Sequence, residues 1–266
     1  MLTFIKLGGS VLTDKNQPES LNTTVLAQVA HTLAEVQHDQ PTTRLLVGHG
    51  GGSFGHYWAQ RYGTQHGVSD ARGWQGVARV QDAMGRLNRA VVAMLLETGL
   101  NALGVPPSAG AVAHNGEIEA WSLTAVEAML DAGLVPVVHG DVVLDRGQGA
   151  AILSTETLFG YLVPRLQPTR LVLVGESGVY TADPQHDAAA ALIPMITPSN
   201  IDAVFAAVGD SHGVDVTGGM ASKVRLMWQI AQQHPTLAIQ FVGPNDLGAA
   251  FNGEGVGTTM QATTAG

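Results

Sequence analysis

Short apolar runs alternate with longer stretches of helical periodicity along this chain of 266 residues. Runs without polar alternation, typical of strands buried on both faces of a parallel sheet, cover residues 2–7, 44–48, 134–138, 170–174 and 238–242. Apolar positions at helical spacing cover residues 21–37, 73–98, 123–132, 155–163, 201–208 and 221–233. Because predicted strands and helices alternate, we expect an α/β fold, a three-layer αβα sandwich with a mainly parallel sheet.

Two segments depart from this alternation and are predicted to be β-hairpins. In residues 111–121 the dipeptide Asn115-Gly116, a frequent hairpin turn, lies between two short strand patterns. Residues 139–153 carry a second turn at 146–149.

The amino-acid composition limits which fold class and which binding partners are plausible for this protein. Hydrophobic residues make up 45% of the chain and charged residues only 13%, as in compact α/β proteins. There is no low-complexity linker, and the one soft boundary lies at residues 162–169, so the length suits one large α/β domain or two small lobes. The formal net charge of −9 comes without a block of like charges, which argues against nucleic acid and anionic membranes as partners.

The sequence lacks cysteine and any targeting or membrane-spanning pattern, which limits the possible chemistry and cellular location of the protein. The chain has no cysteine, which excludes disulfides, thiolate catalysis and cysteine-ligated metal sites. No signal-peptide pattern opens the sequence and no run of about 18 apolar residues occurs. We therefore expect a soluble, cytoplasmic protein without a membrane span.

The chain has only three lysines, and each lies at or close to a glycine-rich turn: Lys6, Lys15 and Lys223. A general preference for arginine would explain why lysine is scarce, but not where the three remain. Lysine is a compact, flexible point charge suited to phosphate oxygens, and neighbouring glycines let backbone N–H groups approach the same anion. The lysines therefore predict a site that handles phosphates.

The strongest local motif is GHGGGSFGH, residues 48–56, directly after a predicted strand. Its glycines, among them Gly51, Gly52 and Gly55, give a backbone that can enclose an anion, and we expect a helix to begin just beyond the motif. His56 closes the motif, where an imidazole can donate to a phosphate oxygen. We therefore predict that His56 contacts the substrate.

The glycine motif has two other interpretations. Gly50, Gly52 and Gly55 formally match the G-x-G-x-x-G turn of dinucleotide-binding folds, which needs an acidic residue at the end of a following strand. The matching region holds Asp70 in a segment without a strand pattern. A P-loop needs G-x-x-x-x-G-K-[ST], which the sequence lacks. Both interpretations are therefore disfavoured.

Two of the lysines occupy positions that are costly without an anion. Lys6 ends a predicted buried strand, where an unpaired ammonium group is unfavourable. Lys223 follows a glycine pair in the first turns of a predicted helix, where a cation opposes the helix dipole. A bound phosphate would offset both costs.

The predicted helix at residues 73–98 carries apolar side chains at spacings of three or four, among them Val80 and Met84. Such a stripe is usually core packing. Glycines within the helix leave hollows along it, so part of this face could instead line an apolar substrate pocket. The sequence leaves both interpretations open.

Taken together and in this order, KLGGS, GHGGGSFGH, PVVHGDVVLD, GVYTADP and VDVTGGMASK resemble the amino acid kinase superfamily, and within it the isopentenyl phosphate kinases. The resemblance covers nearly the whole chain. Its discriminating marks are His56 after GGGSFG, the TDK near the start, and the late VDVTGGM.

The resemblance implies a single domain over residues 1–266, an open αβα sandwich. In it, about residues 1–163 bind the phosphoryl acceptor and about residues 164–266 bind ATP. The implied reaction is isopentenyl phosphate + ATP → isopentenyl diphosphate + ADP, a step of isoprenoid biosynthesis by the mevalonate pathway. Mg²⁺ and a homodimer are implied as well.

The resemblance also assigns roles to residues. The amides of Gly51, Gly52 and Gly55 and the side chain of His56 would hold the acceptor phosphate, with the isoprenoid tail against Val80 and Met84. Three lysines would neutralise the transferring phosphoryl group, oriented by a carboxylate, so the catalytic set is Lys6, Lys15, His56, Glu156 and Lys223. The residues expected to contact ATP are Lys6, Gly8, Gly9, Ser10, Gly178, Tyr180, Asp183, Gly218, Gly219 and Lys223. No side chain is assigned as a metal ligand.

The sequence departs from the family pattern at two places. The family usually carries Ser-Gly-Asp-Asp where this chain has STET at residues 154–157, so Glu156 stands in the place of the aspartate that orients the lysines. The family's Asp-Val-Asp-Gly-Val-Tyr is replaced by GESGVY at residues 175–180. The nucleotide contacts are therefore less closely specified than the acceptor side.

Two alternative functions remain open at this point. A fosfomycin-type phosphonate kinase is similar in fold and also has a histidine in its glycine loop, but its small acceptor needs no long apolar pocket. A non-catalytic nucleotide-binding protein of the same fold has less need for three lysines and His56 at the transfer point.

Overall fold

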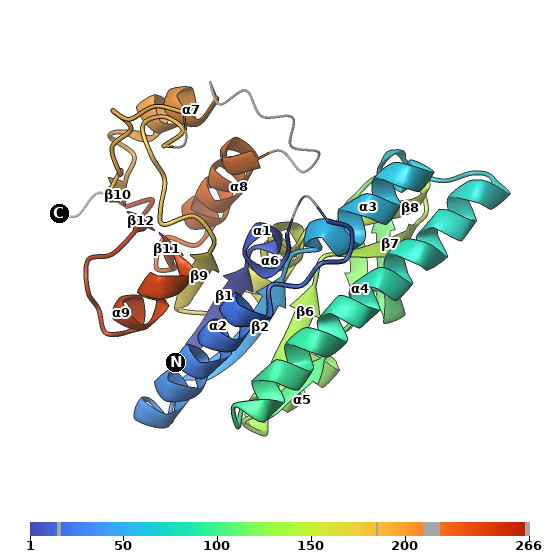
Figure 1. The fold of residues 1–266 in the computed structure, drawn as a ribbon, viewed down its shortest axis with the longest axis horizontal. Helices are drawn as coiled ribbons and strands as arrows, with labels where there is room; N and C mark the ends of the chain where they lie inside the picture. Colours follow the sequence, from blue (N-terminus) through green and yellow to red (C-terminus); the bar gives the residue numbers. More distant parts are fainter. Residues whose placement is uncertain (15–16, 185, 210–218, 264–266) are drawn as a thin grey trace.

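The computed structural model describes residues 1–14, 17–184, 186–209 and 219–263, which form two β-sheets enclosed by helices (Figure 1). The larger sheet has eight strands, and all neighbours in it are parallel except β11 and β12. In spatial order its strands are β10 (Met195–Ile196), β12 (Thr258–Met260), β11 (Ala238–Val242), β9 (Arg170–Val174), β1 (Leu2–Leu7), β2 (Arg44–His49), β6 (Val135–His139) and β3 (Ala102–Gly104).

Helices cover both faces of this sheet, which confirms the predicted three-layer αβα sandwich (Figure 1). One face is covered by α1 (Gly9–Leu12), α2 (Thr23–Asp39), α3 (Gly52–Tyr62), α4 (Ala71–Glu97) and α9 (Leu247–Phe251). The other face is covered by α5 (Thr124–Asp131), α6 (Thr155–Leu166), α7 (Ile201–Gly209) and α8 (Gly219–Gln233).

The central strand β1 shows why the strands lack polar alternation. Phe4 packs on the α6 side, with its ring centroid 5.1 Å from that of Phe159. Ile5 and Leu7 point to the opposite face and join the core under α2 and α4. Because both faces are covered, both sets of alternating side chains are buried. Lys6 points to the same face as Phe4 and is a buried charged residue in this otherwise apolar part of the strand.

Both predicted hairpins form, and together they make the smaller sheet. Its strands lie in the order β5 (Glu117–Trp121), β4 (Ala111–His114), β7 (Asp141–Asp145) and β8 (Gly149–Leu153). The two hairpins join because β4 pairs in parallel with β7, an arrangement that the sequence did not reveal.

Asp145 holds the turns of the two hairpins together. Its carboxylate accepts four backbone N–H groups at 2.7–3.0 Å, those of Asn115, Gly116, Gly147 and Gln148. Burial would raise the pKa of Asp145, but these donors hold it below its usual value.

The bounds of the long elements agree with the sequence prediction to within about two or three residues, and those of β1, β9 and β11 coincide with it. The expected start of a helix beyond the glycine motif was wrong, because α3 begins at Gly52, inside the motif. The predicted helix at 155–163 continues through Pro164 to Leu166. The short elements α1, β3, β10, β12 and α9 were not predicted.

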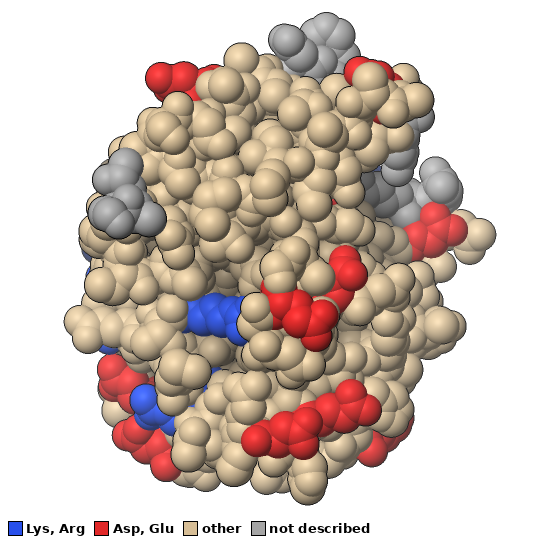
Figure 2. Space-filling view, turned by 90° about the vertical axis from the view of Figure 1, so that its left-hand side faces the viewer, with Lys and Arg blue, Asp and Glu red and all other residues tan. Residues whose placement is uncertain are grey.

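The face shown in Figure 2 carries its charges without a continuous patch of one sign. Figure 2 shows the face at the left of Figure 1, where acidic side chains stand in several separate groups and basic ones are fewer. In the part of the chain that the structure describes, no helix has the length and apolar character needed to cross a bilayer.

Candidate active site

Five neighbouring parallel strands end at the same level of the large sheet, and a glycine follows each of them. In register, the last residues are His139, His49, Leu7, Val174 and Val242. The glycines that follow are Gly140, Gly50, Gly8, Gly175 and Gly243. The first four donate their N–H groups at 2.8–2.9 Å to the last carbonyl of the neighbouring strand, which extends the ladder by one residue. Open α/β sheets bind ligands at this carboxyl edge.

The loops that follow β1 and β2 pack backbone against backbone. A Cβ atom on Gly9 would lie 2.5 Å from the amide nitrogen of Gly52, and one on Gly50 would lie 2.9 Å from the amide nitrogen of Gly9. No side chain fits at these two positions, which explains why KLGGS and GHGGGSFGH both need glycine here.

Thr13 bridges the two loops. Its Oγ1 donates to the carbonyl oxygen of Gly9 at 2.8 Å and accepts the N–H of Ser53 at 2.9 Å. Gly52 has a φ of +45°, and a Cβ on it would lie 2.1 Å from Thr13 Oγ1. Only glycine can therefore occupy the start of α3 while Thr13 fixes this helix to the β1 loop.

Glu19 clamps the segment that follows the β1 loop onto α3 and α4. Its carboxylate accepts the indole N–H of Trp58 at 2.6 Å and pairs with both terminal nitrogens of Arg86. The hydrogen bonds from Arg86 outweigh burial and lower the pKa of Glu19 to about 2. The backbone N–H of Glu19 also donates to the carbonyl of Ser53 at 3.4 Å. We call Glu19, Trp58 and Arg86 the Glu19 clamp.

Lys6 and Glu156 form a buried ion pair at the centre of the edge. Nζ of Lys6 lies 2.6 Å from Oε1 of Glu156, and the two residues are 5% and 7% exposed. Burial alone would raise the pKa of Glu156, but the charge and hydrogen bond of Lys6, with the charge of Lys223, hold it below its usual value. The carboxylate is therefore ionised and fixes the position of the Lys6 ammonium group.

Helix α6 reaches Lys6 because Gly48 has no side chain. Gly48 lies opposite Lys6 in the register of β1 and β2. A Cβ on it would lie 2.6 Å from Thr155 and 2.8 Å from the ring of Phe159. Ser154 caps α6 by accepting the N–H of Thr157 at 3.1 Å, which places Glu156 in the first helical turn.

The other predicted catalytic residues are placed as follows. His56 lies in the second turn of α3 and is exposed. Lys223 is half-buried in α8, and its effect on the pKa of Glu156 places it near the ion pair. Lys15 and Gly218 lie outside the described residues.

Val80 and Met84, predicted to contact the substrate, are each only 2% exposed in the core beneath α4. Met84 lies directly under the glycine motif. Its sulfur would be 3.0 Å from a Cβ on Gly51 and 2.8 Å from one on Gly55. In this structure Met84 therefore supports the glycine loop from below.

Seven further residues predicted to contact ATP lie in segments that follow β1 or β9 or begin α8. Gly8, Gly9 and Ser10 follow β1, and Gly219 begins α8. The remaining three, Gly178, Tyr180 and Asp183, lie in the loop that follows β9. This loop is anchored where the N–H of Val179 donates to Oγ1 of Thr258 in β12 at 2.8 Å.

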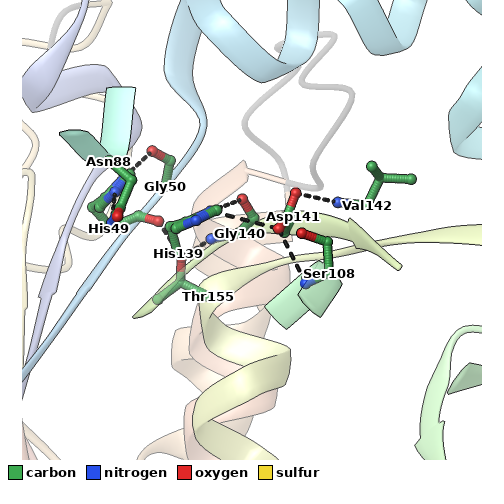
Figure 3. A network of polar contacts seen from close by, with 9 residues as sticks. All are labelled: His49, Gly50, Asn88, Ser108, His139, Gly140, Asp141, Val142 and Thr155. Atoms are coloured by element: carbon green, nitrogen blue, oxygen red, sulfur yellow. Dashed lines mark hydrogen bonds and ion pairs between the residues drawn. The ribbon is translucent and has the colours of Figure 1, made fainter. Parts of the chain in front are cut away.

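A buried polar network behind the glycine motif was missed by sequence reasoning (Figure 3). The rings of His49 and His139, at the ends of β2 and β6, stack with centroids 5.3 Å apart and planes 23° apart. Nε2 of His49 accepts an amide N–H of Asn88 at 3.1 Å. The signal that could have found this network is the His-Gly dipeptide that directly follows two predicted strands, in VGHG and VVHG.

Asp141 and Thr155 complete this network (Figure 3). Burial raises the pKa of the Asp141 carboxyl, although His139 and the N–H groups of Ser108 and Val142 oppose the rise. Thr155 donates its hydroxyl to the carbonyl of His49 at 2.6 Å. Helix α6 is thereby tied to the end of β2.

Comparisons with known protein sequences identify one family and relatives that share one name. Residues 1–239 match the Amino acid kinase family. The chain is 42% identical to an isopentenyl phosphate kinase of Haloferax volcanii, over 98% of each chain. It is 33% identical to an isopentenyl phosphate kinase of Methanothermobacter thermautotrophicus, over 87% of this chain and 88% of the relative.

Solved structures give the same result. One described as X-ray structures of isopentenyl phosphate kinase matches with a TM-score of 0.82 and 28% identity, over 98% of this chain and 100% of the other. A crystal structure of an isopentenyl phosphate kinase substrate complex matches with a TM-score of 0.75 and 25% identity, over 97% and 100%.

Proposed function

We propose, because this chain belongs to the amino acid kinase family and within it to the isopentenyl phosphate kinases, that it phosphorylates isopentenyl phosphate with ATP. The observation that carries this proposal is the buried Lys6–Glu156 pair, which fixes an ammonium group on the glycine-lined edge of the sheet. An oxygen of the acceptor phosphate attacks the terminal phosphorus of ATP. The bond to the bridging oxygen breaks and ADP leaves, without a covalent intermediate on the protein.

The acceptor phosphate is proposed to bind at the start of α3. The first N–H groups of a helix lack intrahelical partners, and its N-cap Gly51 offers no side chain to accept them. Thr13 takes the N–H of Ser53, which leaves the amides of Gly51 and Gly52 as donors for an anion. Gly55 and the side chain of His56 complete this side of the site.

Charge neutralisation is assigned to the lysines. Both substrates are anions, so cations must offset their repulsion before the reacting atoms can meet. Lys6 and Lys223 would carry this charge: the ionised carboxylate of Glu156 pairs with Lys6, and the charge of Lys223 contributes to the lowered pKa of Glu156. Lys15 is proposed to add a third positive charge.

The nucleotide is proposed to lie over the loops that follow β1 and β9 and the start of α8. Its contacts would be Gly8, Gly9, Ser10, Gly178, Tyr180, Asp183, Gly218 and Gly219. Mg²⁺ would enter with ATP, because it usually binds substrate phosphates and keeps several waters, with one or two carboxylates at most. The described residues hold no group of three His, Asp or Glu arranged for a metal, so phosphate oxygens would supply the main ligands.

The tail of the acceptor is proposed to lie beside α4, near Val80 and Met84, although both side chains are buried in this structure. The part of the chain at about residues 1–163 is proposed to bind the acceptor, and the part at about 164–266 to bind ATP. A cytoplasmic homodimer acting in the mevalonate pathway is part of the same proposal. The relatives described above lend no support to a phosphonate kinase or a non-catalytic binder.

The test is ADP release with ATP and Mg²⁺ in the presence of isopentenyl phosphate, fosfomycin or no acceptor, for wild type and His56→Ala. We expect turnover with isopentenyl phosphate alone, largely lost in His56→Ala. Turnover with fosfomycin alone would identify a phosphonate kinase. Tight ATP binding without turnover on either acceptor would favour a binding protein.

A further inference from the structure

The buried residues His49 and His139 make the same hydrogen bond at the ends of two neighbouring strands (Figure 3). Nδ1 of His49 lies 3.1 Å from the carbonyl oxygen of Gly50, and Nδ1 of His139 lies 3.0 Å from that of Gly140. Because a carbonyl oxygen only accepts, each Nδ1 carries the proton. Each imidazole thereby fixes the peptide group that follows its glycine.

The peptide that His49 fixes belongs to the glycine motif. A peptide group is planar and trans, so its C=O and N–H point in opposite directions. With the carbonyl of Gly50 turned towards His49, the N–H of Gly51 is turned away from it, at the N-cap of α3. Gly50 itself is held, because its N–H donates to Leu7 at 2.9 Å and the backbone of Gly9 lies against its Cα.

Asn88 of α4 determines the protonation state of His49. Its amide nitrogen lies 3.1 Å from Nε2 of His49, so Nε2 accepts and the proton stays on Nδ1. Burial, with the neighbouring His139, lowers the pKa of His49 to about 3, and the ring is neutral at neutral pH. In contrast, Nε2 of His139 has no hydrogen-bond partner among the described residues.

We propose that His49 is a positioning residue for phosphoryl transfer: held by Asn88, it orients the Gly50–Gly51 peptide so that the N–H of Gly51 donates to the acceptor phosphate. His49 acts through Gly51 and touches neither substrate. This inference rests on the proposed function, because the acceptor phosphate is the anion that Gly51 would bind.

Two replacements of His49 separate its bond to Gly50 from the rest of the ring. His49→Asn places an amide nitrogen where Nδ1 stands and keeps the donor, whereas His49→Gln places its nitrogen near Nε2 and loses it. We expect His49→Gln to raise the KM for isopentenyl phosphate by about tenfold or more, while the KM for ATP stays within about twofold. His49→Asn is expected to recover most of this loss.

His139→Gln is the matched control, because it removes the equivalent bond from Gly140, which lies outside the glycine motif. It is expected to lower the melting temperature as His49→Gln does, yet leave the KM for isopentenyl phosphate within about twofold. If His49→Gln fails to fold, Asn88→Leu removes the donor to Nε2 and is expected to raise the same KM several-fold.

Three results would overturn the proposal. The first is a folded His49→Gln or Asn88→Leu with the wild-type KM for isopentenyl phosphate. The second is a His49→Asn as impaired as His49→Gln, and the third is a rise in this KM in His139→Gln equal to that in His49→Gln.

A second measurement, of phosphate binding, does not depend on turnover. The amide resonance of Gly51 should shift when inorganic phosphate is added to wild type, and should not shift in His49→Gln. Wild type that fails to phosphorylate isopentenyl phosphate would reject the proposed function, while the phosphate titration would still test His49.

Discussion

Nζ of Lys6 donates a hydrogen bond of 2.6 Å to Oε1 of Glu156, which joins the end of the central strand to the first turn of α6 across 150 residues of sequence. Both groups are buried. Removing two charges from water is costly, and only close geometry offsets that cost. The cost of burying this pair next to a row of strand-end glycines supports the proposed role of Lys6, which is to present a cation to phosphates.

Glu156→Gln is expected to destabilise the protein and to slow turnover. The substitution removes the carboxylate that pairs with the buried Lys6, and removal of one partner of a buried ion pair costs about 3–5 kcal/mol in comparable sites. For a chain of this size we expect a fall in melting temperature of about 6 °C or more. The control is Asp131→Asn, which breaks the exposed pair with Arg44 and should change the melting temperature little. Equal effects of the two substitutions would contradict the prediction.

The same pair predicts a dependence of stability on pH. Lys6 holds the pKa of Glu156 below its ordinary value of 4.5, against the effect of burial. A carboxyl group whose pKa is lowered by folding stabilises the folded state above its ordinary pKa, and this contribution is lost as the pH falls through the folded value. The difference in unfolding free energy between wild type and Glu156→Gln should be full at about pH 7 and should shrink below about pH 4.5. Urea denaturation at a series of pH values measures it, and a difference that grew on acidification would disprove this.

Gly52→Ala is expected to abolish activity and lower stability by more than its backbone cost. The new Cβ would meet Thr13 Oγ1 at 2.1 Å, in addition to a φ of +45° that costs an alanine about 1–2 kcal/mol. Gly63→Ala is the control, because Gly63 has a φ of +72° but no atom within 4 Å of a new Cβ. We expect Gly63→Ala to cost only the backbone term and to keep activity, as measured by thermal melting and ADP release. Equal losses would show that the contact with Thr13 does not matter.

Glu19→Gln is expected to lower kcat several-fold with little change in melting temperature. The Glu19 clamp is partly exposed, so its charge contributes about 0–1 kcal/mol to stability. However, it holds the backbone that follows Lys15 against α3 and α4. Glu119→Gln, which breaks the exposed pair with Arg146 at 3.2 Å on the smaller sheet, is the control and should leave kcat unchanged. A wild-type kcat in Glu19→Gln would show that the clamp does not position this segment.

The sequence was most informative where local pattern decides structure. The buried strands β1, β9 and β11 were placed with their observed bounds because a continuous apolar run bounded by polar or turn residues is typical of a strand covered on both faces. Lys6 and Glu156 were both predicted as site residues, one from an ammonium group in a buried strand and the other from the family motif, and the structure brings the two side chains together. Short elements such as β3 and β10 were missed, since two or three residues cannot show a period.

Contacts between distant parts of the chain could not be predicted. The partners of Glu19 lie 39 and 67 residues away, and nothing in their local sequence indicates that they meet. The same holds for Asn88 and His49, which meet only because α4 crosses the end of β2. The role of Gly48 is a further case, because its need for glycine comes from Thr155 and Phe159 on α6 and not from a turn.

Lys223→Ala is expected to abolish turnover while leaving the fold intact. Lys223 is half-buried near the start of α8, and its charge contributes to the lowered pKa of Glu156. Removal of a cation that acts on the transferring phosphoryl group should reduce kcat by about 100-fold or more. Arg225→Ala on the same helix is the matched control, because this exposed guanidinium stacks 4.5 Å from the ring centroid of Phe205. It should keep kcat within about twofold at the cost of about 0.5–1 kcal/mol of stability. Single-turnover measurements at saturating ATP separate the chemical step from substrate binding. Unchanged turnover in folded Lys223→Ala would show that this lysine does not act in phosphoryl transfer.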